Sequence, residues 1–160
     1  MRSLLKLQKR FLFTCAFQYY LVIFTRILIF KKEKPMLVQS KIHPVLSVTD
    51  LQRAKKFYGE TLGLKSNGDL AEGHAVYEAG EGSFLVIYQR SDPPKAENTV
   101  ASFGVDDVEG TVQWLKDRGV VFEEYDNPGL KTVKGIATIG DLKGAWFKDP
   151  DGNILAVSSA

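Results

Sequence analysis

The stretch AWFKDPDGNILAV, Ala145–Val157, consists of two apolar runs separated by a short polar segment. The polar segment is made up of Asp149, Pro150, Asp151, Gly152 and Asn153. Proline fixes φ, Asp and Asn side chains bond to nearby backbone groups, and Gly tolerates left-handed φ, so these residue types are typical of a chain reversal. The stretch therefore predicts a β-hairpin, in which two strands flank a tight turn.

The chain before this hairpin contains an earlier copy of the same pattern. It begins at Lys41 with the apolar-rich run KIHPVLSV, which predicts a strand. The stretch TDLQRAKKFYGETLG predicts an amphipathic helix, because it has N-cap candidates in Thr49 and Asp50, apolar residues at helical spacing and Gly63 as a C-terminal cap. Three extended runs follow as predicted strands: LKSNGDL, HAVYEA and SFLVIYQ.

The second copy begins after the polar connector RSDPPKAEN. TVASFGV predicts a strand, DDVEGTVQWLKDRG predicts a helix ending at Gly119, and VVFEEYD, GAWFKDP and NILAVSS predict three more strands. The hairpin sequence FKDPDGNILA matches YEAGEGSFLV of the first copy. The sequence thus predicts two tandem βαβββ modules, at 41–90 and 98–159.

The copies differ mainly at 126–142, where the second copy is longer. This segment contains one proline and several glycines, which predicts a long loop or lid over a site.

Charge is distributed unevenly along the chain of 160 residues. Residues 1–35 carry eight Lys or Arg and one Glu, whereas the remaining residues carry 13 basic and 18 acidic side chains. The part predicted to fold, 36–160, is therefore mildly acidic, which disfavours a nucleic-acid partner because such partners need a basic face. The single cysteine, Cys15, excludes an intrachain disulfide and is consistent with a reducing cytosol.

The hydrophobic, basic segment 1–35 allows more than one interpretation. Residues 11–30 are long and apolar enough to cross a bilayer as a helix, although Gln18 and Arg26 weaken this interpretation. No small-x-small cleavage pattern follows, so a secretory signal is disfavoured. Alternatively, the natural protein starts at Met36 and the preceding sequence is a mistaken extension. The protein is predicted to be cytoplasmic if it starts at Met36, and membrane-anchored if residues 11–30 form a membrane-spanning helix.

Three motifs occur in a characteristic order: VTDLQRAKKFYGETLGL, FGVDDVEGTVQWLKDRGV and FKDPDGNIL. With these motifs, residues 41–159 resemble the vicinal oxygen chelate superfamily, which includes glyoxalase I, extradiol dioxygenases, fosfomycin-resistance enzymes and bleomycin-binding proteins. The resemblance implies an α+β fold in which the two modules form a curled mixed sheet around a cleft, with the helices on the convex face. It also implies a homodimer.

In enzymes of this superfamily four cleft-facing side chains hold a divalent metal. The corresponding positions in this chain are His43, Val86, Val100 and Ala156. Only His43 has a donor atom, whereas such sites need three or more N or O donors. A divalent metal is therefore disfavoured, and no cofactor is predicted. The nearest spare donors are His74 and Glu78, on the adjoining strand.

Strand alternation predicts which other side chains face the cleft. The predicted ligand-binding residues are His43, Ser47, His74, Glu78, Tyr88, Ser102, Trp146 and, on the long loop, Lys131. This lining is apolar and aromatic with a few polar groups, as small-molecule pockets usually are. Trp146 and Tyr88 either stack on a flat ligand or fill core volume, and Lys131 either meets an anionic ligand or is solvated.

Three functions follow from these observations. The first is binding of a small apolar or aromatic molecule, as in bleomycin-resistance proteins, without a metal. The second is a metal-dependent lyase, isomerase or dioxygenase that uses His43. The third is a metal-free enzyme in which His43 is the catalytic general base.

Overall fold

The computed structural model describes residue 37 and residues 40–160, apart from the side chain of Glu81. The chain divides into two units, Met1–Ser40 and Lys41–Ala160, and the second contains both modules. The predictions made for 1–35, including the membrane segment at 11–30, lie outside the described residues. Within the described part of the chain, no helix has the length and apolar character needed to cross a membrane.

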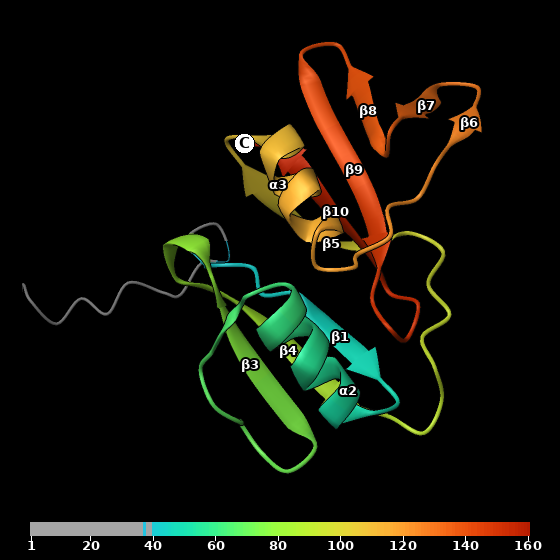
Figure 1. Ribbon diagram of the computed structural model, residues 1–160. Helices are drawn as coiled ribbons and strands as arrows, with labels where there is room; N and C mark the ends of the chain where they lie inside the picture. The colour runs from blue at the N-terminus through green and yellow to red at the C-terminus, as the bar shows by residue number, and fades with distance from the viewer. Residues whose placement is uncertain (1–36, 38–39) are drawn as a thin grey trace, which may run out of the picture. The chain divides into compact units, whose positions relative to one another are not determined.

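The first module contains one helix and a four-stranded sheet (Figure 1). Strand β1 (Val45–Val48) leads to helix α2 (Leu51–Lys55), which continues as the π-helical turn η2 (Lys56–Thr61). The remaining elements are β2 (Lys65–Ser66), β3 (His74–Ala79), the short 3₁₀ turn η3 (Gly80–Gly82) and β4 (Ser83–Gln89). The strand order is β1-β4-β3-β2, with β1 parallel to β4 and the other pairs antiparallel.

The second module repeats this topology with additional strands. Its elements are β5 (Thr99–Val105), α3 (Val108–Lys116), β6 (Asp126–Asn127), β7 (Leu130–Val133), β8 (Ile136–Ile139), β9 (Leu142–Lys148) and β10 (Ile154–Ser159). The order is β5-β10-β9-β8-β7-β6, with β5 parallel to β10. The predicted α+β fold with two βαβββ modules is confirmed, and the strands form two separate sheets.

The predicted start of each helix is confirmed, at the N-caps Asp50 and Asp107. The side chain of Asp50 accepts hydrogen bonds from the backbone N–H groups of Gln52 and Arg53, at 2.9 and 3.0 Å. Asp107 caps α3 in the same way, accepting from Gly110 N–H at 2.9 Å. These N-caps satisfy donors that have no partner within the first helical turn.

The segment 126–142 is not the predicted loop, because β6, β7 and β8 occupy much of it. Left-handed glycines at 129 and 135, with φ of 89° and 83°, provide the reversals between these short strands. VVFEEYD, predicted to be a strand, makes an isolated bridge between Phe122 and Phe147, and only its last residue, Asp126, belongs to a strand, β6. Strand β8 pairs with β9 as β2 pairs with β3, so β8 takes the place in the second module that β2 has in the first. The predicted strand LKSNGDL is reduced to Lys65–Ser66.

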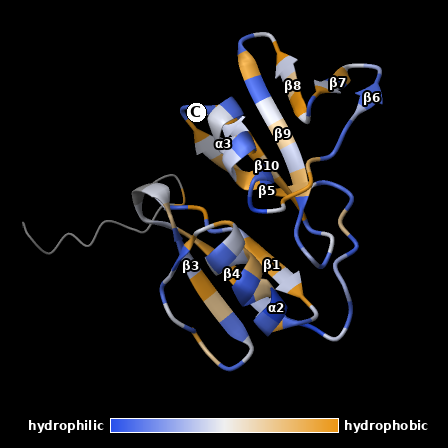
Figure 2. Cartoon of the chain, viewed as in Figure 1, coloured by the Kyte–Doolittle hydropathy of each residue, from blue (hydrophilic) through white to orange (hydrophobic). Residues whose placement is uncertain are grey.

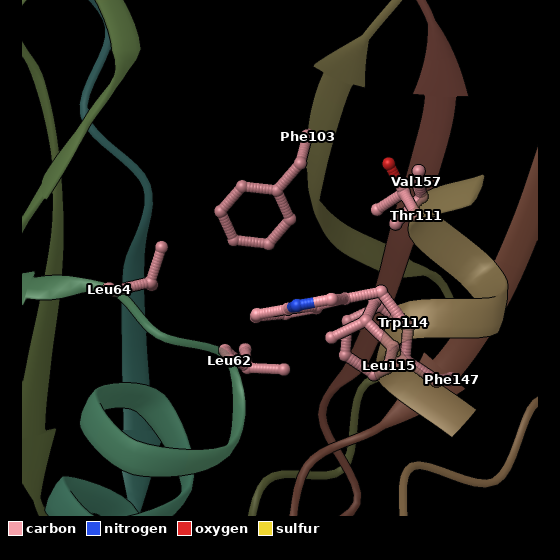
Figure 3. Close-up of a pocket in the computed structure, with 8 residues that line it drawn as sticks. All are labelled: Leu62, Leu64, Phe103, Thr111, Trp114, Leu115, Phe147 and Val157. Atoms are coloured by element: carbon pink, nitrogen blue, oxygen red, sulfur yellow. The ribbon is translucent and has the colours of Figure 1, made fainter. Parts of the chain in front are cut away.

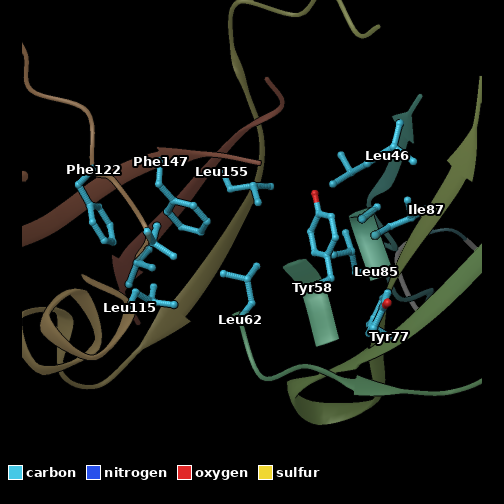
Figure 4. Close-up of a cluster of buried hydrophobic side chains, with 14 of the residues drawn as sticks. Leu46, Tyr58, Leu62, Tyr77, Leu85, Ile87, Leu115, Phe122, Phe147 and Leu155 are labelled. Carbon is cyan, nitrogen blue, oxygen red and sulfur yellow. The ribbon is translucent and has the colours of Figure 1, made fainter. Parts of the chain in front are cut away.

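A single hydrophobic cluster connects the two modules on the helix side of their sheets (Figure 4). Leu46 and Ile87 contribute from the first sheet, and Phe147 and Leu155 from the second. Colouring by hydropathy shows apolar residues along the central strands of both sheets, with polar residues along the outer surfaces of α2 and α3 (Figure 2). Burying a side chain of this kind contributes about 1.5–3 kcal/mol, so the cluster is a main source of stability.

Candidate functional site

Four of the predicted site residues lie on the open face of the first sheet, opposite α2, and a fifth, His43, lies next to it. Ser47, Tyr88 and His74 occupy one transverse row, because Ser47 pairs with Tyr88 and Tyr88 pairs with His74. Glu78 pairs with Phe84 in a second row. Since paired residues on neighbouring strands point to the same side of a sheet, the structure brings these predicted residues together on one face.

His43 lies two residues before β1 and is exposed. Its Nδ1 accepts a hydrogen bond from the backbone N–H of Phe84 at 3.0 Å, and the two rings are 5.4 Å apart. Because Nδ1 is the acceptor, the proton of the neutral imidazole is on Nε2. The free nitrogen of His43 is therefore a hydrogen-bond donor rather than a base.

His74 has the opposite tautomer. Its Nδ1 lies 3.1 Å from the carbonyl oxygen of Glu72, and since a carbonyl only accepts, Nδ1 carries the hydrogen. Nε2 of the neutral ring is then an acceptor. The ring stacks on Tyr88, with centroids 6.2 Å apart and planes at 25°. The first open face thus presents one imidazole donor and one imidazole acceptor.

The side chain of Glu78 is engaged in an ion pair. Its carboxylate accepts from Nζ of Lys65 at 2.9 Å, and both side chains are exposed. Exposed pairs of this kind contribute little to stability, and Glu78 remains accessible to a polar group.

The open face of the second sheet is dominated by Trp146. Its Nε1–H donates to Oγ1 of Thr99 at 3.1 Å, and its ring packs edge-to-face against Tyr125 at 5.7 Å. A side chain at 144 would meet the indole at 3.2 Å, so the glycine there lets the ring lie close to the sheet. Ala156 pairs with Trp146 and is only 5% exposed. The indole therefore lies next to Ala156, one of the four positions that the resemblance implies for metal ligands.

Ser102 is the other predicted residue on this face. It pairs with Ala156, and its hydroxyl shares a 3.0 Å hydrogen bond with the hydroxyl of Ser158. Ser102 is exposed on β5, which is the edge strand of its sheet.

Lys131 is separated from the other predicted residues. Thr132, its neighbour on β7, pairs with Ala137, which in turn pairs with Gly144 beside Trp146. Because successive side chains alternate, Lys131 points to the opposite side of the sheet, where it forms an exposed 3.0 Å ion pair with Asp126. The structure therefore does not bring Lys131 together with Trp146 and the other predicted ligand-binding residues.

The four positions implied for a metal provide one donor, on His43. The side chains of Val86, Val100 and Ala156 have no N or O atom, and Nδ1 of His43 already accepts from the backbone. Within the part of the chain that the structure describes, no group of three or more His, Cys, Asp or Glu side chains could hold a metal ion. The residues present do not fit the divalent metal of the superfamily.

The two modules are joined by a polar cluster that sequence analysis did not identify. The turn between β9 and β10 contacts the end of β1 and the start of α2. Tyr58 donates to Oδ2 of Asp149 at 2.8 Å, and Nδ2 of Asn153 donates to the carbonyl oxygen of Ser47 at 3.0 Å. We call this contact the closed junction.

Asp151 completes the closed junction. Its Oδ1 accepts from the backbone N–H of Thr49 at 2.8 Å and from the Thr49 hydroxyl, and it forms a 3.1 Å ion pair with Arg53. Burial of the Asp151 carboxyl raises its pKa, but the hydrogen bonds from Thr49 and Arg53 outweigh this and leave the pKa below its ordinary value. Burial, followed by the nearby Asp149 carboxylate, raises the pKa of Tyr58 far above its ordinary value.

In the equivalent region of the internal repeat, the turn of the first module and β5 line one groove, and the described side chains there do not repeat the Tyr58–Asp149 and Asn153–Ser47 bonds. Ala79 and Gly104 take the places of Asp149 and Ser47, and Leu115 takes that of Tyr58. Ser83, in the place of Asn153, donates its hydroxyl to Gly80 within its own turn, at 2.6 Å. We call this region the open junction.

A groove of about 660 Å³ lies at the open junction. Its walls include Ser83 from the first module and Ser102, Phe103 and Asp106 from the second. A smaller hollow of about 190 Å³ adjoins it, shares Ser83, Ser102 and Phe103, and reaches Phe84, whose ring contacts His43. The groove therefore contains one predicted site residue, Ser102, and the adjoining hollow reaches Phe84, which contacts a second, His43. A comparison of the two turns, one rich in Asp and Asn and the other not, is the sequence signal that could have indicated it.

Comparison with known proteins agrees with the fold and the duplicated motifs. Residues 41–157 match the model of the Glyoxalase/Bleomycin resistance protein/Dioxygenase superfamily. An integron cassette protein from the mobile metagenome of V. cholerae is 28% identical, with 79% of this chain and 98% of that one covered and a TM-score of 0.53. A glyoxalase/dioxygenase from Nostoc punctiforme is 20% identical, with 79% and 94% covered and a TM-score of 0.55.

A lactoylglutathione lyase from Agrobacterium tumefaciens is 17% identical, with 76% of this chain and 94% of that one covered and a TM-score of 0.58. The structural likenesses below 25% identity concern the fold alone. Because the family model covers most of the chain, this protein belongs to the Glyoxalase/Bleomycin resistance protein/Dioxygenase superfamily.

Proposed function

We propose that this protein binds a small apolar or aromatic molecule in the groove at the open junction, without a divalent metal. The observation that carries the proposal is the groove itself, since about 660 Å³ lies within the range of small-molecule sites. Phe84 and Phe103 offer aromatic surface, and the hydroxyl of Ser102 offers a hydrogen bond.

The chemistry of the donor set supports binding without a metal. Three of the four superfamily positions, Val86, Val100 and Ala156, have no donor atoms. At the fourth, the free Nε2–H of His43 suits an acceptor such as a carbonyl or hydroxyl oxygen. This tautomer also argues against His43 as a general base, because the neutral ring has no free lone pair on the exposed nitrogen.

A ligand screen on the full chain tests the proposal. A compound that binds the folded state raises the melting temperature, by roughly 2–5 °C at about ten times its Kd. We expect this rise with EDTA present, and we expect Ser102→Phe, which fills the groove, to abolish it. Ser91→Phe, at an exposed serine in the connector, is the matched control and should respond like the wild type.

Elemental analysis of the purified protein measures its content of divalent metal and can contradict the metal-free proposal. Stoichiometric divalent metal that is lost in His43→Ala would overturn the metal-free proposal in favour of the metal-dependent lyase, isomerase or dioxygenase. A ligand response that persists in Ser102→Phe would place the ligand elsewhere.

A further inference from the structure

A separate apolar pocket of about 160 Å³ lies on the helix side of the sheets (Figure 3). Leu62 and Leu64, which follow η2 of the first module, form one wall, and Trp114 and Leu115 of α3 form another. The pocket thus has walls from both modules. It is distinct from the predicted cleft, which lies on the open faces of the sheets.

The lining of this pocket is almost entirely hydrocarbon. Thr111 has the one hydroxyl among the lining side chains, and this hydroxyl donates to the carbonyl oxygen of Asp107 at 2.7 Å. No carboxylate, ammonium or guanidinium group lines the pocket. A charged occupant would lose its hydration without gaining a partner, so the site selects neutral molecules.

Trp114 is held in position as a flat wall. The guanidinium of Arg118 lies 3.5 Å from its ring centroid, and the far edge of the indole lies against Gly63. A Cβ at position 63 would be 3.2 Å from the ring, and the φ of +70° there also favours glycine. Even so, Trp114 is 41% exposed, which leaves aromatic surface available to an occupant.

We propose that this pocket is a second binding site, for a neutral molecule with a single aromatic ring. An engineered apolar cavity of roughly 150 Å³ in another protein binds benzene, so a volume of about 160 Å³ suits one ring. Figure 3 shows the indole of Trp114 between Phe103 and Leu62, an arrangement that offers a flat ring both stacking and edge contacts. The occupant would contact both modules and stabilise their association.

Phe103 connects this site with the groove at the open junction, because it lines both. The two sites are nevertheless separable by substitution. Thr111 and Leu64 line only the apolar pocket, and Ser102 lines only the groove side.

Fluorobenzene is the probe for this proposal, observed by ¹⁹F NMR with the full chain. We expect its resonance to broaden with the wild-type protein and its affinity to fall at least five-fold in Thr111→Leu, which fills the pocket. Gln113→Leu adds the same apolar group on an exposed position of α3 and is the matched control, with wild-type affinity expected. Leu64→Phe is a second variant that fills the pocket, and it tests the proposal if Thr111→Leu does not fold.

Tryptophan fluorescence locates the bound ring. The chain has two tryptophans, so in Trp146→Phe the emission comes from Trp114 alone, and fluorobenzene should change it. Wild-type affinity in both folded filling variants, or no binding by the wild-type protein, would overturn the proposal. Ser102→Phe should retain fluorobenzene binding, so failure of the groove proposal and failure of this one are distinguishable.

Discussion

The phenol hydroxyl of Tyr58, in the first module, donates a 2.8 Å hydrogen bond to Oδ2 of Asp149, in the β9–β10 turn of the second. Tyr58 is fully buried, and Asp149 is 5% exposed. The bond therefore holds the modules together in a region that excludes water, where an unpaired partner is costly.

Tyr58→Phe should lower the free energy of unfolding by about 1–3 kcal/mol, because it leaves a buried carboxylate oxygen with one partner fewer. Urea denaturation measures the change. The matched control is Tyr77→Phe, since Tyr77 is also buried but its hydroxyl makes only a 3.4 Å contact with the carbonyl oxygen of Lys55. Equal losses in the two variants would contradict the importance of the Tyr58–Asp149 bond.

Asp151→Asn should lower stability at pH 7 by on the order of 1 kcal/mol, because a charged acceptor is lost from Thr49 and Arg53. The pKa of Asp151 is lower in the folded than in the unfolded protein. Its ionised form therefore contributes stability above the unfolded pKa of about 3.9, and this contribution disappears as the pH falls through the folded value. Urea unfolding at several pH values should show the two proteins converging below about pH 4. A constant difference down to pH 2 would show that ionisation is not involved.

Gly63→Ala should cost more stability than Gly119→Ala, although both glycines have positive φ, at 70° and 85°. Placing an L-residue in this region costs about 1–2 kcal/mol at either site. At position 63 the methyl group would also meet Trp114 at 3.2 Å, whereas nothing lies within 4 Å at position 119. Denaturation measures the difference, and a shift of Trp114 emission in Gly63→Ala alone would confirm its cause. Identical costs without such a shift would contradict this contact.

His43→Ala should lower stability by about 1 kcal/mol, because it leaves the N–H of Phe84 without its acceptor. The metal content of the purified protein should be the same before and after the substitution. His43→Asn, whose side-chain oxygen can also accept, should recover part of the stability. Equal stability of the wild type, His43→Ala and His43→Asn would show that the bond contributes little.

Much of the fold could be predicted because the signals are local. The caps at Asp50 and Asp107, the positive φ of Gly63 and the alternation in β3 and β4 depend on neighbouring residues, and the duplication then fixes the topology. The segment 126–142 could not be predicted, since strands of two to four residues are too short to show a period and their glycines resemble those of a loop.

The site was only partly predictable for a different reason. Alternation places His74, Glu78 and Tyr88 on one face, but it does not indicate which hydrogen bond each ring makes, and those bonds determine the tautomers of His43 and His74. The junction bonds join residues about a hundred positions apart, such as Thr49 and Asp151. Such pairs depend on how the modules pack, which no local pattern reveals.

The closed junction depends on side chains that differ between the two copies of the repeat. The donors Thr49 and Tyr58 belong to the first half, and the acceptors Asp149 and Asp151 belong to the second. A pair of identical first halves would have Ala79 in place of Asp149 and so no carboxylate for the hydroxyl of Tyr58, and a pair of identical second halves would have Leu115 in place of Tyr58 and so no hydroxyl for Asp149. The two copies have thus become complementary rather than equivalent, and each requires the other to form the buried bonds that join them.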